Sequence, residues 1–187
     1  GLEEFTTDER NPDKSLIGTR FAQGDIVTTV LTCARGETIL LRLDTTLPRS
    51  YSRDFTVRGT KGMYMQDTNS VFLDGDDESF EPVKYYEKAL NSAVKFENEY
   101  LPGIWKNITE EMLKAGHGGM DWFAYKAFTD ALINGEEMPV DVYDAATWQA
   151  VAVLSEMSIK QGGAPQIMPD FTNGKWFKRP RKDVCRL

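Results

Sequence analysis

Residues 25–46 read DIVTTVLTCARGETILLRLDTT, and this stretch decides the fold class that the sequence predicts. Its two halves are rich in β-branched side chains, which favour strands, and Arg35-Gly36 between them is typical of a tight turn. The second half alternates, so that its apolar side chains share one face and its polar ones the other: Ile39, Leu41 and Leu43 against Arg42, Asp44 and Thr46. The sequence therefore predicts an antiparallel hairpin with one buried face. It predicts an α+β fold with a mostly antiparallel sheet and helices packed on one side.

Strand and turn signals continue downstream of the hairpin. Further strands are predicted over residues 51–58, 63–66 and 71–73. The acidic loop at residues 74–78 lacks the spacing of a calcium loop, so no metal is expected there. Residues 82–114 are predicted to be helical in pieces, broken near Pro102-Gly103.

Two helices with stronger signals follow. Apolar residues recur at helical spacing from Met120 to Leu132, and Asn134-Gly135 ends that run. Asp144 is the predicted N-cap of a second helix that reaches about Lys160. Its centre, Ala150 to Leu154, is apolar on all sides, which predicts deep burial.

Composition excludes several classes of partner. The 187 residues carry a net charge of −7, which argues against nucleic acid and against an anionic membrane surface. The basic residues at positions 175–182 are interpreted as a solvated tail. Cys33 and Cys185 are too far apart in the sequence for a zinc motif, and no apolar run is long enough to span a bilayer. No G-x-G-x-x-G, P-loop or G-x-S-x-G is present. The residues alone thus indicate an α+β domain that either binds a sugar or oligomerises.

Four segments in a fixed order resemble a known family. They are DTTLPRSYSR at residues 44–53, GTKGMY at 59–64, GHGGMD at 116–121, and DVYDAATW at 141–148, with GGAP and PDFTNGKW following at 162–165 and 169–176. Together they are similar to glycoside hydrolase family 109, within the Gfo/Idh/MocA oxidoreductases. The resemblance covers about Gly24 to Trp176.

The resemblance implies a division of labour. In the family, a Rossmann domain that binds NAD precedes an α+β domain, and many members are α-N-acetylgalactosaminidases. NAD oxidises the sugar's 3-hydroxyl, elimination and addition of water follow, and the hydride returns. We expect NAD to belong to the missing Rossmann half, no cofactor to bind this chain, and the chain alone to be inactive.

The resemblance also suggests site residues. Tyr51 matches a tyrosine that reaches the substrate pocket, although Ser50 stands where the family has a proline. Arg49 and Arg53 either hold sugar oxygens or the acetamide carbonyl, or pair with Asp44 and Asp54. His117 is either a base or the residue that caps the next helix. No residue of the chain is assigned with certainty to catalysis.

These inferences divide the chain into a polar lead-in at residues 1–24, the domain at 25–177 and a basic tail at 178–187. Partners are an N-acetylhexosamine-type sugar, the missing Rossmann domain and, through the open sheet, a second copy of the chain. Two alternatives stay open: a domain of an NAD(P)-dependent sugar oxidoreductase, and mainly an oligomerisation module. The sequence leaves the compartment undecided, although an exported protein fits if the parent carries a signal peptide.

Overall fold

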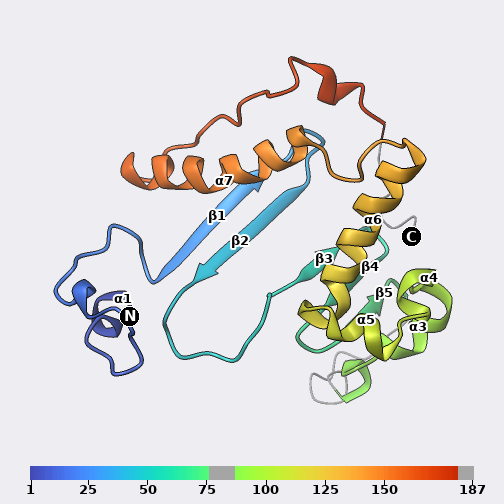
Figure 1. The fold of residues 1–187 in the computed structure, drawn as a ribbon, viewed down its shortest axis with the longest axis horizontal. Helices are drawn as coiled ribbons and strands as arrows, with labels where there is room; N and C mark the ends of the chain where they lie inside the picture. The colour runs from blue at the N-terminus through green and yellow to red at the C-terminus, as the bar shows by residue number, and fades with distance from the viewer. Residues whose placement is uncertain (76–86, 181–187) are drawn as a thin grey trace. The chain divides into compact units, whose positions relative to one another are not determined.

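The computed structural model describes residues 1–75 and 87–180 (Figure 1). It divides into two compact units, Gly1–Ser52 and Arg53–Leu187. The described strands form a two-stranded sheet in the first unit and a three-stranded sheet in the second, both antiparallel. This arrangement confirms the predicted α+β class. Most of the predicted acidic loop and the start of the predicted helical region fall on residues 76–86, outside the described ranges.

The lead-in of the first unit is folded rather than loose. It contains helix α1 (Leu2–Phe5) and the 3-10 helix η1 (Lys14–Leu16). Asn11 is buried, and its side-chain amide donates to the Thr6 carbonyl at 3.0 Å and to the Asp13 carbonyl at 2.8 Å. The Leu2 amide donates to Asp25 Oδ1 at 2.7 Å, which fastens the lead-in to the residue before the first strand.

The predicted hairpin is present. Strand β1 (Ile26–Thr32) pairs with β2 (Thr38–Asp44), so that Ile26 lies opposite Asp44. The turn closes through the Cys33 amide, which donates to the Glu37 carbonyl at 2.8 Å, and Gly36 supplies the positive φ that the turn requires. The prediction that one face of the hairpin is buried is wrong, because no residue of either strand is buried and Ile39, Leu41 and Leu43 are 44%, 41% and 51% exposed.

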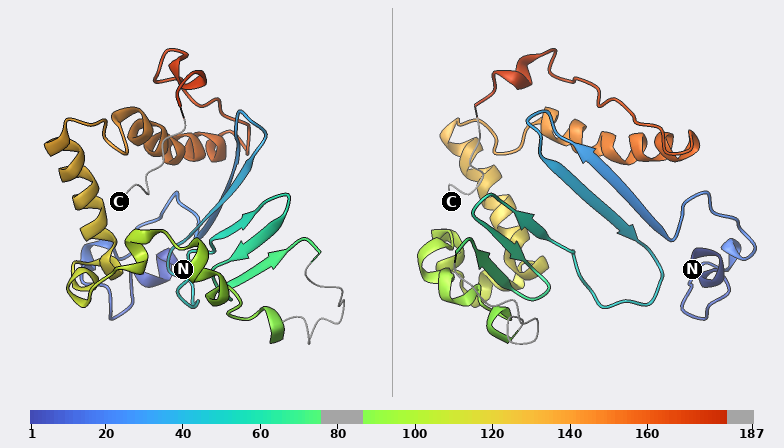
Figure 2. Two further views of the ribbon diagram at one scale, coloured as in Figure 1. Left: turned by 90° about the vertical axis from the view of Figure 1, so that its right-hand side faces the viewer. Right: turned by 180° about the vertical axis from the view of Figure 1, so that it is seen from behind.

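The second unit begins with a small sheet. Strands β3 (Thr56–Arg58), β4 (Gly62–Met65) and β5 (Ser70–Leu73) lie in sequence order, as the view from behind in Figure 2 shows. The third predicted strand is therefore three residues long instead of eight, and Asp54, which has a positive φ of 49°, interrupts its first half. Ser70 is almost completely buried, and its hydroxyl donates to the Ala89 carbonyl at 2.6 Å. This bond fastens the sheet to the chain that leads into the helices.

The helices of the second unit follow the sheet. They are α3 (Val94–Tyr100), α4 (Gly103–Lys106), α5 (Glu110–Lys114), the 3-10 turn η2 (His117–Gly119), α6 (Met120–Asn134), α7 (Val142–Lys160) and the 3-10 turn η3 (Lys175–Phe177). The predicted break near Pro102-Gly103 is confirmed, because α3 ends at Tyr100 and α4 begins at Gly103. Gly135 ends α6 in the left-handed conformation, as predicted.

Two predictions about α7 are wrong. The N-cap is Asp141, whose Oδ1 accepts from the amides of Tyr143 at 2.9 Å and Asp144 at 3.1 Å. Asp144 instead completes the capping box, since its Oδ2 accepts from the Asp141 amide at 3.2 Å. No residue of α7 is buried, and Val153 in its apolar centre is 58% exposed. An apolar helix surface favours burial, but other parts of the structure decide whether anything packs against it.

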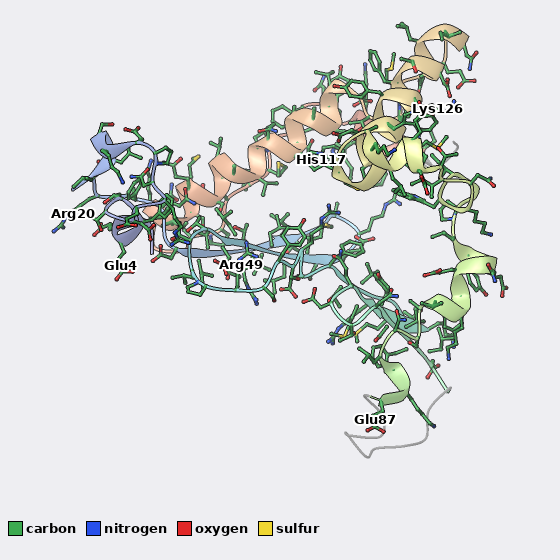
Figure 3. The ribbon with its side chains drawn as sticks, turned by 60° about the horizontal axis from the view of Figure 1, so that its bottom comes forward. Glu4, Arg20, Arg49, Glu87, His117 and Lys126 are labelled. Atoms are coloured by element: carbon green, nitrogen blue, oxygen red, sulfur yellow. The ribbon has the colours of Figure 1, made fainter. Side chains whose placement is uncertain are left out.

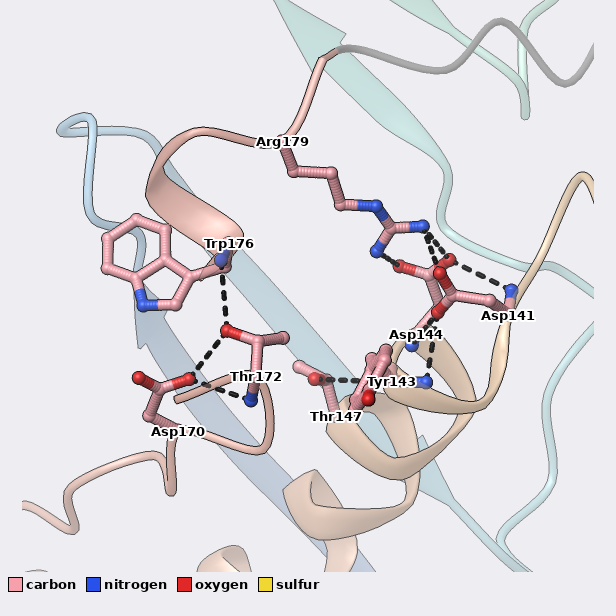
Figure 4. A network of polar contacts seen from close by, with 8 residues as sticks. All are labelled: Asp141, Tyr143, Asp144, Thr147, Asp170, Thr172, Trp176 and Arg179. Atoms are coloured by element: carbon pink, nitrogen blue, oxygen red, sulfur yellow. Dashed lines mark hydrogen bonds and ion pairs between the residues drawn. The ribbon is translucent and has the colours of Figure 1, made fainter. Parts of the chain in front are cut away.

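The segment after α7 returns to the start of that helix (Figure 4). The Arg179 guanidinium donates to Asp144 Oδ1 and Oδ2, both at 2.9 Å, and pairs with Asp141 Oδ2 at 2.7 Å. The hydrogen bonds that Arg179 donates to Asp144 raise the pKa of Arg179 above its usual range. Arg179 therefore anchors the end of the described chain, and its interpretation as part of a solvated tail is wrong.

Candidate functional site

His117 lies in a turn of unusual backbone conformation between α5 and α6. Gly116, His117, Gly118 and Gly119 all have positive φ, at 91°, 46°, 65° and 95°. Glycine adopts a positive φ without strain, but a residue with a side chain does so at a cost in energy, so the backbone of His117 is strained. Because strain of this kind persists only where neighbouring contacts maintain it, the surroundings of the turn are informative.

Two glycines let the turn pack closely on both sides. A Cβ on Gly116 would stand 2.5 Å from Asp121 Oδ2, so only a glycine lets that carboxylate fold over the turn. A Cβ on Gly119 would stand 3.1 Å from Ile108 Cδ1 and 3.2 Å from the Met112 carbonyl oxygen. The turn is thus pressed against α5 on one side and against the first turn of α6 on the other.

Asp121 holds the His117 ring. Nδ1 of His117 lies 3.0 Å from both carboxylate oxygens of Asp121, which is four residues further along. Because a carboxylate accepts, Nδ1 is the donor in this contact, and in the neutral ring Nε2 is then left as an acceptor. The histidine side chain is 72% exposed, so the pair presents an oriented imidazole at the surface (Figure 3). A fixed tautomer with an accessible second nitrogen is the arrangement of a proton carrier.

An aromatic cluster supports the start of α6. Phe123 is one of the few buried side chains, at 7% exposed. Its ring centroid lies 4.7 Å from that of Trp105 and 5.2 Å from that of Trp122, the latter nearly edge-on. The residue directly before this cluster is Asp121, so packing of the rings fixes the turn of helix that carries the carboxylate.

Arg53 connects two of the sequence segments within the second unit. Its Nη1 lies 3.9 Å from the sulfur of Met120, the first residue of α6. The guanidinium therefore stands at the helix start that follows the His117 turn. The structure thus places Arg53 near the start of α6, and its role in binding a sugar stays a prediction.

Arg49 and Tyr51 lie in the first unit, after the end of β2. Arg49 pairs with Asp44, at 3.3 Å from Nε to Oδ2, which is the salt bridge weighed as one of its two roles. Tyr51 is 81% exposed, so its phenol is accessible to a ligand. Figure 3 labels Arg49 beside the end of the hairpin.

Neither a metal centre nor a membrane-spanning helix is found in the described part of the chain. Across residues 1–75 and 87–180, no cluster of three or more His, Cys, Asp or Glu side chains is arranged to hold a metal ion. Asp74, at the start of the acidic loop, pairs with Lys61 at 3.6 Å. None of the helices in these ranges combines the length and the apolar character that a membrane crossing needs.

Sequence reasoning missed Asp121 as the partner of His117. It assigned the carboxylate to the first helical turn, where a negative charge is favourable in any case. The i, i+4 spacing of His117 and Asp121 was the available signal, because residues four apart meet on one side of a helix. A turn of consecutive glycines hides that signal, since regular helical geometry cannot be assumed across it.

Comparisons with known proteins identify what the chain is similar to. Residues 1–178 match the family described as "Glycosyl hydrolase 109, C-terminal domain". A glycosyl hydrolase family 109 protein of Stenotrophomonas maltophilia (strain K279a) is 45% identical over 160 residues, covering 86% of this chain and 34% of the relative. An alpha-N-acetylgalactosaminidase of Tannerella forsythia is 38% identical over 179 residues, covering 96% and 36%. One of Shewanella oneidensis (strain ATCC 700550 / JCM 31522 / CIP 106686 / LMG 19005 / NCIMB 14063 / MR-1) is 34% identical over 175 residues, covering 92% and 36%. The chain spans about a third of the length of these curated relatives.

Proposed function

The chain belongs to the family of glycosyl hydrolase 109 C-terminal domains, and from this premise we propose that it is the substrate-side part of an NAD-dependent glycosidase. The proposed substrate is a terminal α-linked N-acetylgalactosamine, because relatives that cover almost the whole chain carry the name alpha-N-acetylgalactosaminidase. The structural observation that carries the proposal is the His117–Asp121 pair, which has the geometry of a proton carrier. The names of these relatives favour hydrolysis over a purely oxidative reaction.

The cofactor is assigned to another part of a longer protein. This chain contains no G-x-G-x-x-G, the motif that holds a dinucleotide in a Rossmann domain. When bound, NAD supplies the redox chemistry that makes the proton at C2 of the sugar acidic. The residues of this chain then have two tasks, which are to hold the sugar and to move protons.

His117 is the proposed proton carrier for the leaving group. Departure of the glycosidic oxygen is easier when a proton reaches it, and the water that adds afterwards must give one up. With Nδ1 held by Asp121, the imidazolium form of His117 gives its Nε2 proton to the leaving group, and the neutral ring then takes a proton from the adding water through the same nitrogen. Arg53, beside the same helix start, is proposed to bind a sugar oxygen or the acetamide carbonyl.

The leaving group provides a test of this role. In a longer protein that joins this chain to its nucleotide-binding domain, His117→Gln is expected to lower kcat about 100-fold or more on a natural glycoside. The loss should be much smaller on an aryl glycoside whose phenolate leaves without a proton. Tyr125→Phe, at a 73% exposed position on α6, is the matched control and should leave both rates unchanged. Equal losses on the two substrates would remove His117 from proton transfer.

A second test addresses the division of labour. We propose that the 187-residue chain alone neither binds NAD in a calorimetric titration nor hydrolyses a chromogenic α-N-acetylgalactosaminide. Adding the nucleotide-binding domain in the same polypeptide should restore both properties. Turnover by the isolated chain would place the cofactor site within these residues and overturn the assignment. Accumulation of an oxidised sugar by the longer protein would instead favour the oxidoreductase alternative.

Self-association is also proposed for the isolated chain. The hairpin exposes several large apolar side chains, among them Val30 at 62%, Leu40 at 58% and Leu43 at 51%. Exposed apolar surface of this kind favours association. Light scattering should show oligomers that a Leu40→Lys substitution disperses, whereas a monomer at high concentration would contradict the proposal.

A further inference from the structure

Arg49 uses each of its three guanidinium nitrogens within its own loop. Nε lies 3.3 Å from Asp44 Oδ2, and Nη2 donates to the main-chain carbonyl of Asp44 at 3.3 Å. Nη1 donates to the carbonyl of Ser50, also at 3.3 Å. The planar fork of the guanidinium makes such a set of contacts in a way that a single ammonium group cannot. Arg49 therefore bridges the beginning and the end of the segment from Asp44 to Ser50.

The Asp44 end of this bridge is fixed. Asp44 is the last residue of β2 and is paired with Ile26 across the hairpin. The next residue, Thr45, donates from its amide at 3.1 Å and from its hydroxyl at 3.2 Å to the Asp25 carbonyl. The Asp44 side chain is only 19% exposed, and Oδ1 is a buried atom with no hydrogen-bond partner among the described residues. Compensation of this carboxylate by Arg49 is therefore important to the strand end.

The other end of the bridge reaches the peptide before Tyr51. The Ser50 carbonyl and the Tyr51 amide belong to one planar peptide unit. A hydrogen bond to that carbonyl oxygen therefore restricts the orientation of the peptide that leads into Tyr51. The segment between Asp44 and Tyr51 lies outside helix and strand. Arg49 thus transmits the fixed position of the strand end to the residue proposed to contact the sugar.

We infer that Arg49 is a positioning residue for Tyr51 and not itself a ligand of the sugar. This inference rests on the proposed function only in taking Tyr51, which the family resemblance matches to a tyrosine of the substrate pocket, as the contact with the sugar. Holding the loop in advance lowers the ordering cost of binding, so the role acts on substrate affinity more than on the chemical step. Three of the five guanidinium N–H groups are engaged in the loop, which gives Arg49 a role in the loop that does not depend on a sugar.

The first test measures order in the 187-residue chain and needs no activity. NMR relaxation of the Ser50 and Tyr51 backbone amides should give order parameters of about 0.85 in the native chain and below about 0.6 in Arg49→Ala. Arg49→Lys should resemble Arg49→Ala, because one ammonium group cannot make the three contacts. Arg35→Ala is the matched control, since it removes the same charge at the opposite, turn end of the hairpin and should change nothing.

The second test separates positioning from direct binding. In the longer protein, Arg49→Ala is expected to raise KM about tenfold, equivalent to one lost charged hydrogen bond, with kcat changed less than about threefold. Asp44→Asn should reproduce this effect, and the double variant should be no worse than either single variant. A direct sugar ligand at Arg49 predicts instead that Asp44→Asn is harmless.

The two tests fail independently of each other and of the proposed function. If the longer protein has no glycosidase activity, the proposed function is wrong, while the order parameters still decide whether Arg49 holds the loop. If Tyr51 stays ordered in Arg49→Ala although circular dichroism shows a native fold, the inference is overturned. The same holds if KM changes with Arg49→Ala but not with Asp44→Asn.

Discussion

The β1–β2 hairpin and the corner formed by α5, η2 and α6 each carry candidate site residues, but they hold them in different ways. At the corner, Gly119 fits against α5, and buried Phe123 packs on Trp105 and Trp122 behind the His117–Asp121 pair. The hairpin has a complete ladder from Ile26 to Asp44, yet none of its strand residues is buried. Its loop depends instead on polar contacts of a single arginine.

This difference teaches that backbone pairing and side-chain cover are separate sources of order. Hydrogen bonds of a hairpin define its register, but most folding free energy comes from burying apolar surface, and two strands alone are marginal. The corner can therefore orient a proton carrier by packing. The position of Tyr51 after the hairpin therefore depends on how firmly polar contacts hold the end of β2. The predictions below test this contrast, from the largest expected effect to the smallest.

The largest effect is expected from the aromatic cluster. Phe123→Ala should lower the free energy of unfolding of the second unit by about 3 kcal/mol, because it empties a buried site against two indole rings. The matched hairpin change, Leu40→Ala at a position 58% exposed, should stay within about 0.5 kcal/mol. Urea unfolding measures both, followed by tryptophan fluorescence for Phe123→Ala, because all four tryptophans lie in the second unit, and by far-ultraviolet circular dichroism for Leu40→Ala. Comparable losses would contradict the contrast.

The next effect comes from the glycines of the turn. Gly119→Ala combines a φ of +95° with a Cβ at 3.1 Å from Ile108 and should cost about 2 kcal/mol. Gly118→Ala has a φ of +65° but open space around its Cβ, so the expected cost is about 1 kcal/mol. Thermal unfolding of the pair separates contact from backbone strain, and equal costs would show that the contact with α5 contributes nothing.

A smaller change, in one proton position, is expected at His117. It is the only histidine in the chain, so its nitrogen resonances are unambiguous. In the neutral ring, nitrogen chemical shifts should show the proton on Nδ1 in the native chain. In Asp121→Ala the ring should shift toward the Nε2–H form because the acceptor for Nδ1 is gone. An unchanged tautomer would mean that Asp121 does not orient the ring.

The smallest expected effect is a change in the pKa of Asp13, which lies in the same unit as the hairpin. The Ser15 hydroxyl donates to Asp13 at 2.6 Å and the Ser15 amide at 3.0 Å, and these bonds lower the pKa of Asp13 below its ordinary 3.8. A lowered pKa contributes stability above pH 3.8 that is lost as the pH falls through the folded-state value. Carboxyl chemical shifts during an acid titration should show this in the native chain. In Ser15→Ala the Asp13 pKa should move back toward 3.8.

Much of the fold followed from local signals. The β-branched runs around Arg35-Gly36 predicted the hairpin, and Gly135 predicted the end of α6, because turns and caps are decided by a few adjacent residues. The cap of α7 was placed at the wrong aspartate. Asp141 and Asp144 stand three residues apart in a capping box, in which each carboxylate accepts a hydrogen bond from the backbone amide of the other residue. The residue at which the helix begins decides which aspartate is the N-cap, and that residue is seen only in the structure.

The candidate site was predicted as a set of residues but not as a geometry. Tyr51, Arg49, Arg53 and His117 were named from their segments, whereas Asp121 entered only with the observed distance to Nδ1. The role of Arg49 as a bridge required the positions of two carbonyls, and no spacing in the sequence gives those. Arg179 was likewise assigned to a tail until its contacts with the start of α7 were seen.

The sequence by itself determined the α+β class, the hairpin and the family, because these depend on patterns of adjacent residues or on their order along the chain. Tertiary structure alone decided which carboxylate meets His117, which carbonyls Arg49 fastens, and which apolar faces remain uncovered. Those outcomes depend on contacts between residues whose positions follow from strained turns and side-chain packing. A sequence specifies such contacts only through the whole fold, since no local preference carries a distance between two side chains.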